Sequence, residues 1–174
     1  ELDAAGPYQY KNLQTVLQSV ELLREPFSLK EDQIRYGLAH LRALTRFIGR
    51  WQVIGENPTV LCDSAHNEGG LKLVTERLKS LTYDRLHIVL GTVNDKDVRK
   101  MLSLLPREAI YYFARPDIPR GLEVERLKEV GEELGLKGEV YPSVAEALAA
   151  ARAKAGPEDL IFVGGSIFVV AEVI

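Results

Sequence analysis

The sequence predicts an α/β protein: a Rossmann-like, mostly parallel sheet of about six strands, one of them antiparallel, with helices on both faces and a helical hairpin in front. Short apolar segments alternate with helical segments from residue 59 onward, which is typical of βαβ units. Right-handed crossovers would make this sheet doubly wound. Several of the predicted strands end in polar or glycine-rich loops, so we expect the ligand-binding edge to lie where those strands end.

The first part of the chain predicts two helices. Asn12 can cap a helix over residues 12–24, because apolar residues recur after it at helical spacing until Pro26. Ser28 can cap a second helix that has Asp32 in its first turn. The segment 45–49 is the clearest joint in the chain. We therefore expect two units: 1–48, a helical hairpin with its linker, and 49–174, the sheet.

The sheet unit opens with two short apolar segments, 51–54 and 59–62, which are close enough to pair as a β-hairpin. Helix and strand patterns then alternate to the end of the chain. Gly135 stands where a helix needs a left-handed C-terminal residue, and Ser143 with Glu146 forms a capping box. The predicted helices cover 67–81, 96–105, 123–134 and a segment from 143, and the predicted strands cover 87–90, 109–113, 139–141 and 160–163, before a closing helix after 164–166.

Composition excludes several classes of function. The 174 residues carry a net charge of −3 without a block of like charges, which argues against a nucleic-acid partner. The lone Cys62 cannot form an internal disulfide, and the sequence has no metal-type cysteine spacing. No apolar run approaches the ~18 residues of a membrane span, and no signal peptide is visible. We expect a soluble cytoplasmic protein with no membrane partner and, since it starts at Glu1, a piece of a longer one.

Asp63 is the first candidate site residue, because it stands at the end of a predicted strand and before a helix. A carboxylate in that position can accept both hydroxyls of a ribose. The alternative is an aspartate that caps the following turn through its own backbone. No GxGxxG motif follows this strand, so the usual dinucleotide fingerprint is absent.

Arg50 and His66 flank this aspartate. If the two strands between Arg50 and Asp63 pair as a hairpin, both residues lie at the same end of the sheet, and the guanidinium could bind a phosphate in bidentate fashion. The alternative is a surface arginine at a joint. His66 precedes a helix start that Asn67 can cap and Glu68 can favour, so it could face an anionic ligand or be merely structural.

Two more loops follow strands. The segment 91–97 contains Asp95, Lys96 and Asp97, which suit a site or a solvated helix start equally well. The Gly-Gly-Ser at 164–166 could offer backbone N–H groups to an anion. Three loops at one sheet edge indicate binding and not a particular reaction, because the chain has no nucleophile–base pair and no GxxxxGK[ST] phosphate loop.

The motifs GRWQ, VLCDSAHNEGG, LGTVNDKD and GGSIFVVAEV, preceded by GPYQYKN, resemble in this order the C-terminal domain of folylpolyglutamate synthase/dihydrofolate synthase, in the Mur ligase superfamily. The resemblance implies an ATP-dependent ligase that adds L-glutamate to dihydropteroate or folate through an acyl phosphate, with Mg²⁺ on the phosphates. It also implies a partner in cis, the N-terminal ATPase domain, which would supply the phosphate loop and the metal ligands.

The resemblance assigns roles to five residues. Asn12 and Arg50 would contact ATP at the adenine and the phosphates, and Asp63 would hold the ribose. His66 and Ser166 would line the glutamate side of the cleft. It implies no catalytic residue and no metal ligand in this stretch of chain, which would therefore be inactive alone. Two alternatives stay open: a Mur-type peptidoglycan amino-acid ligase domain, and a non-catalytic nucleotide-binding or interaction module.

Overall fold

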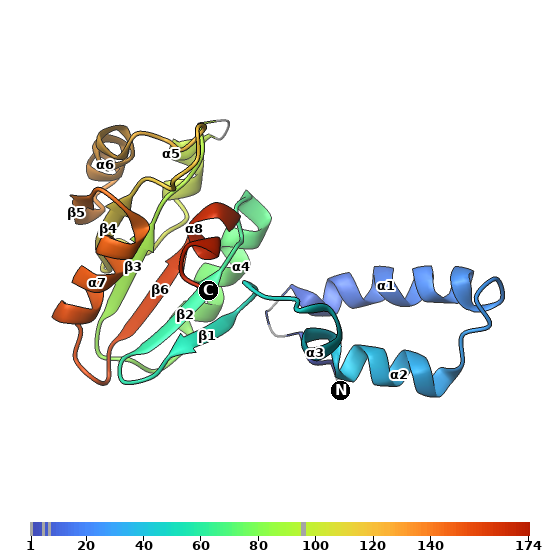
Figure 1. The fold of residues 1–174 in the computed structure, drawn as a ribbon. Helices are drawn as coiled ribbons and strands as arrows, with labels where there is room; N and C mark the ends of the chain where they lie inside the picture. The colour runs from blue at the N-terminus through green and yellow to red at the C-terminus, as the bar shows by residue number, and fades with distance from the viewer. Residues whose placement is uncertain (1, 5, 7, 95–96) are drawn as a thin grey trace.

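The protein consists of a helical hairpin that projects from an α/β sheet unit (Figure 1). The computed structural model describes residues 2–4, 6, 8–94 and 97–174. A single six-stranded sheet has the order β1-β2-β6-β3-β4-β5. The predicted fold class is thus confirmed, including the hairpin that precedes the sheet.

The helices and strands follow the predicted alternation. The strands are β1 (Gln52–Gly55), β2 (Thr59–Asp63), β3 (Leu86–Leu90), β4 (Ile110–Ala114), β5 (Lys137–Tyr141) and β6 (Leu160–Gly164). The helices are α1 (Gln9–Arg24), α2 (Glu31–Ala39), α3 (Leu41–Thr45), α4 (Glu68–Lys79), α5 (Val98–Leu102), α6 (Val124–Glu133), α7 (Val144–Lys154) and α8 (Ile167–Ala171).

Strand pairing determines which chain segments become neighbours. β1 pairs antiparallel with β2, with Gln52 opposite Cys62, as the predicted β-hairpin requires. All other pairs are parallel, and β6 is inserted between β2 and β3. The carboxyl ends of β2, β6, β3 and β4 therefore meet at one edge of the sheet.

Helices cover both faces of the sheet because its strands alternate apolar side chains between the two sides. On β6, Phe162 belongs to a core with α4, α5 and α6, whereas Ile161 and Val163 belong to a second core with α7 and α8. These three side chains are fully buried. Two packed layers of helices thus hold the sheet edge in place.

The hairpin differs in detail from its prediction. α1 begins at Gln9, so Asn12 lies within its first turns and does not cap it. α2 begins at Glu31, where the side chain of Gln33 accepts the N–H of Lys30 at 2.9 Å, so Ser28 is not its cap. A side-chain acceptor three residues into the helix has replaced the expected serine. Asp32 lies in the first turn as predicted, and α3 is a short helix that the sequence did not reveal.

The caps of the sheet unit agree with prediction. Asn67 accepts the N–H of Gly70 at 2.8 Å, and the Ser143 hydroxyl accepts the N–H of Glu146 at 3.2 Å. Gly135 has the left-handed φ of +81° that ends α6. Within the described ranges, no helix is both long and apolar enough to cross a membrane.

Candidate functional site

The candidate site begins at the edge where the parallel strands end. Gly164 lies opposite Asp63 of β2 and Leu90 of β3, so the loops after these three strands are neighbours, as predicted. The loops after β3 and β6 touch backbone to backbone: a side chain at Gly165, which has φ +94°, would come within 2.5 Å of the Gly91 carbonyl oxygen. This close contact holds the loops after β3 and β6 together at the carboxyl edge of the sheet.

Asp63 lies inside this edge and is fully buried. Its Oδ1 accepts the N–H of Ala65 at 2.7 Å, and its Oδ2 accepts the N–H of Trp51 at 2.8 Å and the hydroxyl of Tyr8 at 2.5 Å. The bond to Ala65 is the local turn-capping interaction that the sequence left as an alternative. The other two bonds reach across to β1 and to the hairpin, so Asp63 does more than cap a turn.

Arg50 lies at the same end of the sheet as Asp63, as the strand pairing predicts. The Ser64 N–H donates to the Gly49 carbonyl at 2.9 Å, which continues the β1–β2 pairing past the strand ends. The Arg50 guanidinium carbon lies 5.8 Å from the centre of the Tyr8 ring, within cation–π range. Trp51 has φ +44°, an unusual backbone conformation for a bulky residue. Such strain is common at functional sites.

A hollow of about 400 Å³ opens between the hairpin and the sheet unit beside these residues. Its size lies within the range of about 300–1,000 Å³ that small-molecule sites occupy. Three of the predicted residues, Asn12, Arg50 and His66, line this hollow together. The complete lining comes from the hairpin (Tyr8, Gln9, Asn12), the joint (Phe47, Arg50) and the approach to and first turns of α4 (Ala65, His66, Asn67, Gly70, Leu73).

His66 presents one ring nitrogen for binding. Its Nδ1 lies 3.1 Å from the Ser64 carbonyl oxygen, which can only accept, so in the neutral imidazole the proton is on Nδ1 and Nε2 is an acceptor. The side chain is exposed at the hollow. Asn12, on the opposite wall, donates from Nδ2 to the Gln9 side-chain oxygen at 2.9 Å, which leaves its own carbonyl oxygen open toward a ligand.

Ser166 does not line the hollow, although it shares the same sheet edge. It is buried and caps α8, where its hydroxyl oxygen accepts the N–H of Phe168 at 3.3 Å. The structure therefore groups three predicted residues around one hollow, buries Asp63 next to it and leaves Ser166 outside it. The role of each stays a prediction.

The loop after β3 is only partly described. Asp95 and Lys96 lie outside the described residues. Asp97 caps α5, where it accepts the N–H of Lys100 at 3.0 Å, as a solvated helix start would.

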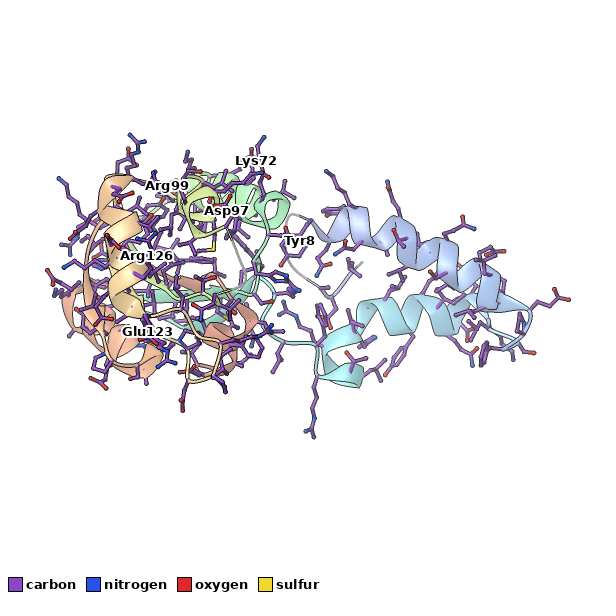
Figure 2. All side chains as sticks on the ribbon, turned by 90° about the horizontal axis from the view of Figure 1, so that it is seen from above. Tyr8, Lys72, Asp97, Arg99, Glu123 and Arg126 are labelled. Carbon is purple, nitrogen blue, oxygen red and sulfur yellow. The ribbon has the colours of Figure 1, made fainter. Side chains whose placement is uncertain are left out.

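Sequence reasoning missed one residue of the site, Tyr8, and one neighbouring loop. Tyr8 reaches Asp63 from 55 positions earlier in the chain, and Figure 2 places it at the junction of α1 and the sheet unit. The loop after β4 brings Arg120 over the ring of Phe168, 5.0 Å from its centre, and the Asn94 N–H donates to the Arg120 carbonyl at 3.0 Å. The post-strand position of this loop was the signal that could have identified it.

Burial dominates the electrostatics of the site. It raises the pKa of Asp63, and the hydrogen bonds from Tyr8, Ala65 and Trp51 only partly oppose this rise. Burial, together with the hydrogen bond to Asp63 and its negative charge, raises the pKa of Tyr8. Tyr8 is therefore a neutral donor to Asp63. The carboxylate has no ion pair within the described part of the chain, and the charge of Arg50 opposes the rise of its pKa less than these hydrogen bonds do.

The fold and the hollow define a class of protein: an α/β domain with a small-molecule site outside the carboxyl ends of its parallel strands. The family model for the Mur ligase, glutamate ligase domain matches residues 49–167. The chain belongs to this family.

Individual proteins extend the similarity to the hairpin. The chain is 37% identical over 168 residues to a probable bifunctional folylpolyglutamate synthase/dihydropteroate synthase of Haloferax volcanii, which covers 96% of this chain and 19% of that protein. Mycobacterium tuberculosis folylpolyglutamate synthase complexed with ADP and AMPPCP superposes with a TM-score of 0.81 at 26% identity, over 97% of this chain and 40% of the other. Escherichia coli FolC in complex with DHPP and ADP gives 0.70 at 35% identity, over 83% and 34%. The chain thus spans a fifth to two fifths of these proteins.

Proposed function

We propose that this chain is the carboxyl-terminal part of an ATP-dependent ligase that adds L-glutamate to dihydropteroate or folate. The observation that carries the proposal is the hollow where Asn12, Arg50 and His66 converge above the buried Asp63. The similarity to folylpolyglutamate synthases, two of them bound to ADP, supports the choice of nucleotide and reaction.

The reaction has two balanced steps. The substrate carboxylate attacks the γ-phosphorus of ATP, which gives an acyl phosphate and ADP. The amino group of glutamate then attacks the acyl carbon, the C–O bond to phosphate breaks, and the amine loses a proton to give an amide and inorganic phosphate. In the described residues, we find groups that can position ATP and the amine donor, and none that must form a bond.

Arg50, Asp63 and Asn12 bind the nucleotide in this proposal. The Arg50 guanidinium can donate two parallel hydrogen bonds to phosphate oxygens. Asp63 accepts the ribose hydroxyls at the end of β2, and the free amide oxygen of Asn12 accepts the adenine amino group from the hairpin wall. In this proposal the nucleotide lies between the two units, which would have to be closed on one another for chemistry.

His66 and Ser166 serve the amine donor. The free Nε2 of His66 can accept a proton of the glutamate ammonium group, and the Ser166 hydroxyl, whose oxygen already accepts the Phe168 N–H, can donate to a carboxylate. Both stand at the carboxyl edge, on the α4 and α8 sides. In this proposal the two side chains orient glutamate toward the nucleotide phosphates.

The described residues of this chain do not form a Mg²⁺ site. No group of three or more histidine, cysteine, aspartate or glutamate side chains in its described part is placed to hold a metal ion. The ATP phosphates and the upstream part of the protein would hold the metal. In this chain, the positive charge of Arg50 would neutralise part of the negative charge of the phosphates.

The same proposal divides the chain into 1–48, the tail of a central ATPase domain, and 49–174, the ligase C-terminal domain. The hairpin supports this, because α2 buries none of its residues and large apolar side chains of the hairpin are exposed: Leu22 by 71%, Phe27 by 69% and Tyr36 by 57%. Exposed apolar surface of this kind indicates an interface with another part of the protein. The ATPase domain in cis would provide it, and the enzyme would work in the cytoplasm.

A ligation assay tests the proposal in the protein that carries this chain. Steady-state ADP release, beyond the first turnover, should require both glutamate and dihydropteroate or a folate. Arg50→Ala should lower kcat/KM about hundredfold, as the loss of one charge-stabilising group does. Arg46→Ala, which removes an exposed arginine of the joint, is the matched control and should stay near wild type. Steady-state release of ADP without glutamate dependence would contradict the proposal.

The 174-residue chain by itself should bind ATP weakly and turn nothing over. It carries the proposed contacts of Asn12, Arg50 and Asp63 to the nucleotide, but no phosphate loop is found in its sequence. Calorimetry with ATP and a ligation assay on this chain check both statements. A sub-micromolar Kd or ligation above an Arg50→Ala background would contradict them.

A further inference from the structure

The bond between Tyr8 and Asp63 joins the hairpin to the sheet at the candidate nucleotide site. The hydroxyl of Tyr8 donates to Oδ2 at 2.5 Å, and the Asp63 side chain is completely buried. Tyr8 lines the hollow, whereas Asp63 does not. A ligand in the hollow therefore meets Tyr8 before it can meet the carboxylate.

The three donors to Asp63 are not equivalent. Those of Trp51 and Ala65 are backbone N–H groups, fixed by the β1–β2 pairing and by the turn after β2. The donor of Tyr8 is a hydroxyl on a side chain with rotatable bonds, in a residue just before α1. Only Tyr8 can leave the carboxylate without unfolding the edge of the sheet.

A ribose bound at Asp63 would need the carboxylate oxygen to which Tyr8 donates. Its two adjacent hydroxyls donate in parallel to the two oxygens of a carboxylate, and Oδ2 already accepts two hydrogen bonds. A buried carboxylate that loses a donor and gains none pays a desolvation penalty, so an exchange of one hydroxyl donor for another is favoured over simple release.

We propose that Tyr8 is a positioning residue. Its hydroxyl donates to the Asp63 carboxylate while no nucleotide is bound, and the ribose hydroxyls replace it as donors when a nucleotide binds. The inference rests on the proposed function. It makes the ribose a competitor of the hairpin, so that nucleotide binding breaks one of the bonds that connect the hairpin to the sheet. The Tyr8 ring can remain beside Arg50 after its hydroxyl has moved.

Removing the competing hydroxyl tests the proposal. Tyr8→Phe keeps the ring and deletes the donor, and Tyr10→Phe is the matched control, because Tyr10 is on the adjoining turn of α1 and 77% exposed. The probes are ATP and 2′,3′-dideoxy-ATP, titrated by calorimetry against the 174-residue chain. Fluorescence of Trp51, the single tryptophan and a donor to Asp63, gives a second readout.

We expect Tyr8→Phe to bind ATP about tenfold more tightly than wild type, the size of one hydrogen bond to a charged group. It should bind the dideoxy nucleotide as wild type does, since that ligand has no hydroxyls to offer Asp63. Tyr10→Phe should match wild type for both ligands. Measurable ATP binding by Tyr8→Phe alone would also support the proposal.

Other outcomes overturn it. Equal ATP affinity in Tyr8→Phe and wild type, a loss of affinity, or an equal gain for both nucleotides would each remove Tyr8 as a competitor of ribose and leave the proposed function standing. If the 174-residue chain binds ATP too weakly to titrate, the same titrations on the protein that carries this chain decide, and ATP binding by no variant there would overturn the proposed function and this inference with it. Far-UV circular dichroism checks folding, and Tyr8→Leu takes the place of Tyr8→Phe if the latter does not fold.

Discussion

Two buried aspartates occupy opposite edges of the same sheet, and their surroundings differ in kind. Asp63, at the carboxyl edge, accepts two backbone N–H groups and one tyrosine hydroxyl. Asp159, at the amino edge before β6, accepts the Gly156 N–H at 2.8 Å, the Arg85 guanidinium at 2.8 Å and His87 Nε2 at 3.1 Å. One acid is held by neutral donors and the other by a cation and an imidazole.

The pKa shifts follow this difference. Burial alone would raise the pKa of Asp159, but its hydrogen bonds from Gly156, Arg85 and His87 outweigh burial and lower the pKa to about 2. For Asp63 burial prevails and the pKa rises. An acid whose charge is fully compensated serves the fold, whereas an acid whose compensation is incomplete can still gain from a ligand.

The largest expected effect is on folding and belongs to Asp159. Asp159→Asn removes the charge that compensates Arg85 and forces an amide N–H₂ toward donors, so it should lower the free energy of unfolding by about 3 kcal/mol. Urea unfolding followed by circular dichroism measures it. A loss below about 1 kcal/mol would mean that this network does not hold the amino edge together.

The same network sets the response to acid. His87 is fully buried, its Nδ1 lies 2.9 Å from the Tyr112 hydroxyl, and its pKa is lowered, first by burial and then by the charges of Arg85 and Lys154, against the opposing effect of Asp159. The unfolded chain therefore binds more protons below about pH 6.5, so stability should fall with pH from there. Asp159 adds a further loss below about pH 4 as it is protonated.

Unfolding free energies measured from pH 8 to pH 3 check this slope. His87→Gln should flatten the part of the curve between pH 7 and pH 5 and leave the part below pH 4. An unchanged slope in His87→Gln would assign the acid response to other groups.

Asp63→Asn should cost less stability than Asp159→Asn, about 1 kcal/mol. The substitution relieves a buried charge that has no ion pair among the described residues, and the asparagine oxygen can still accept one backbone N–H. The Tyr8 hydroxyl can reverse and accept from the amide. Side-by-side urea unfolding of the two variants tests the ranking, and equal losses would remove the distinction between the two acids.

Tyr112→Phe should have the smallest effect, up to about 1 kcal/mol, because it deletes a neutral donor to His87 Nδ1. It should leave ATP affinity unchanged, unlike Tyr8→Phe, which deletes the corresponding hydroxyl at the other edge. Thermal unfolding and calorimetry with ATP separate the two tyrosines.

The sequence predicted the sheet well because its signals are local. Alternating apolar strands, the caps at Asn67 and Ser143 and the short connection between β1 and β2 each act within a few residues. From them the neighbourhood of Arg50 and Asp63 follows, as does the meeting of the post-strand loops. The hairpin was predicted less precisely, since α1 begins without a side-chain cap and α2 begins with a hydrogen bond to Gln33, in place of the expected Asn12 and Ser28 caps.

The part of the site that the sequence did not predict depends on contacts between residues far apart in the chain. No periodicity or motif connects Tyr8 to Asp63 across 55 positions, and the fold alone shows that a hairpin side chain occupies the sheet's acid. The placement of Ser166 outside the hollow had the same cause, because the side on which a post-strand loop opens depends on packing of α8 against the sheet. Roles carried over by resemblance thus needed the structure to group them.

ATP titration of Asp63→Asn and Asp159→Asn by calorimetry, at a temperature where both are folded, tests most directly whether the carboxyl edge is the nucleotide site. We predict at least a tenfold loss of ATP affinity for Asp63→Asn, since an amide offers one acceptor to two ribose hydroxyls. Asp159→Asn, although less stable, should stay within about twofold of wild type, because its network lies at the other edge. Unchanged affinity in Asp63→Asn, or an equal loss in both variants, would contradict this assignment.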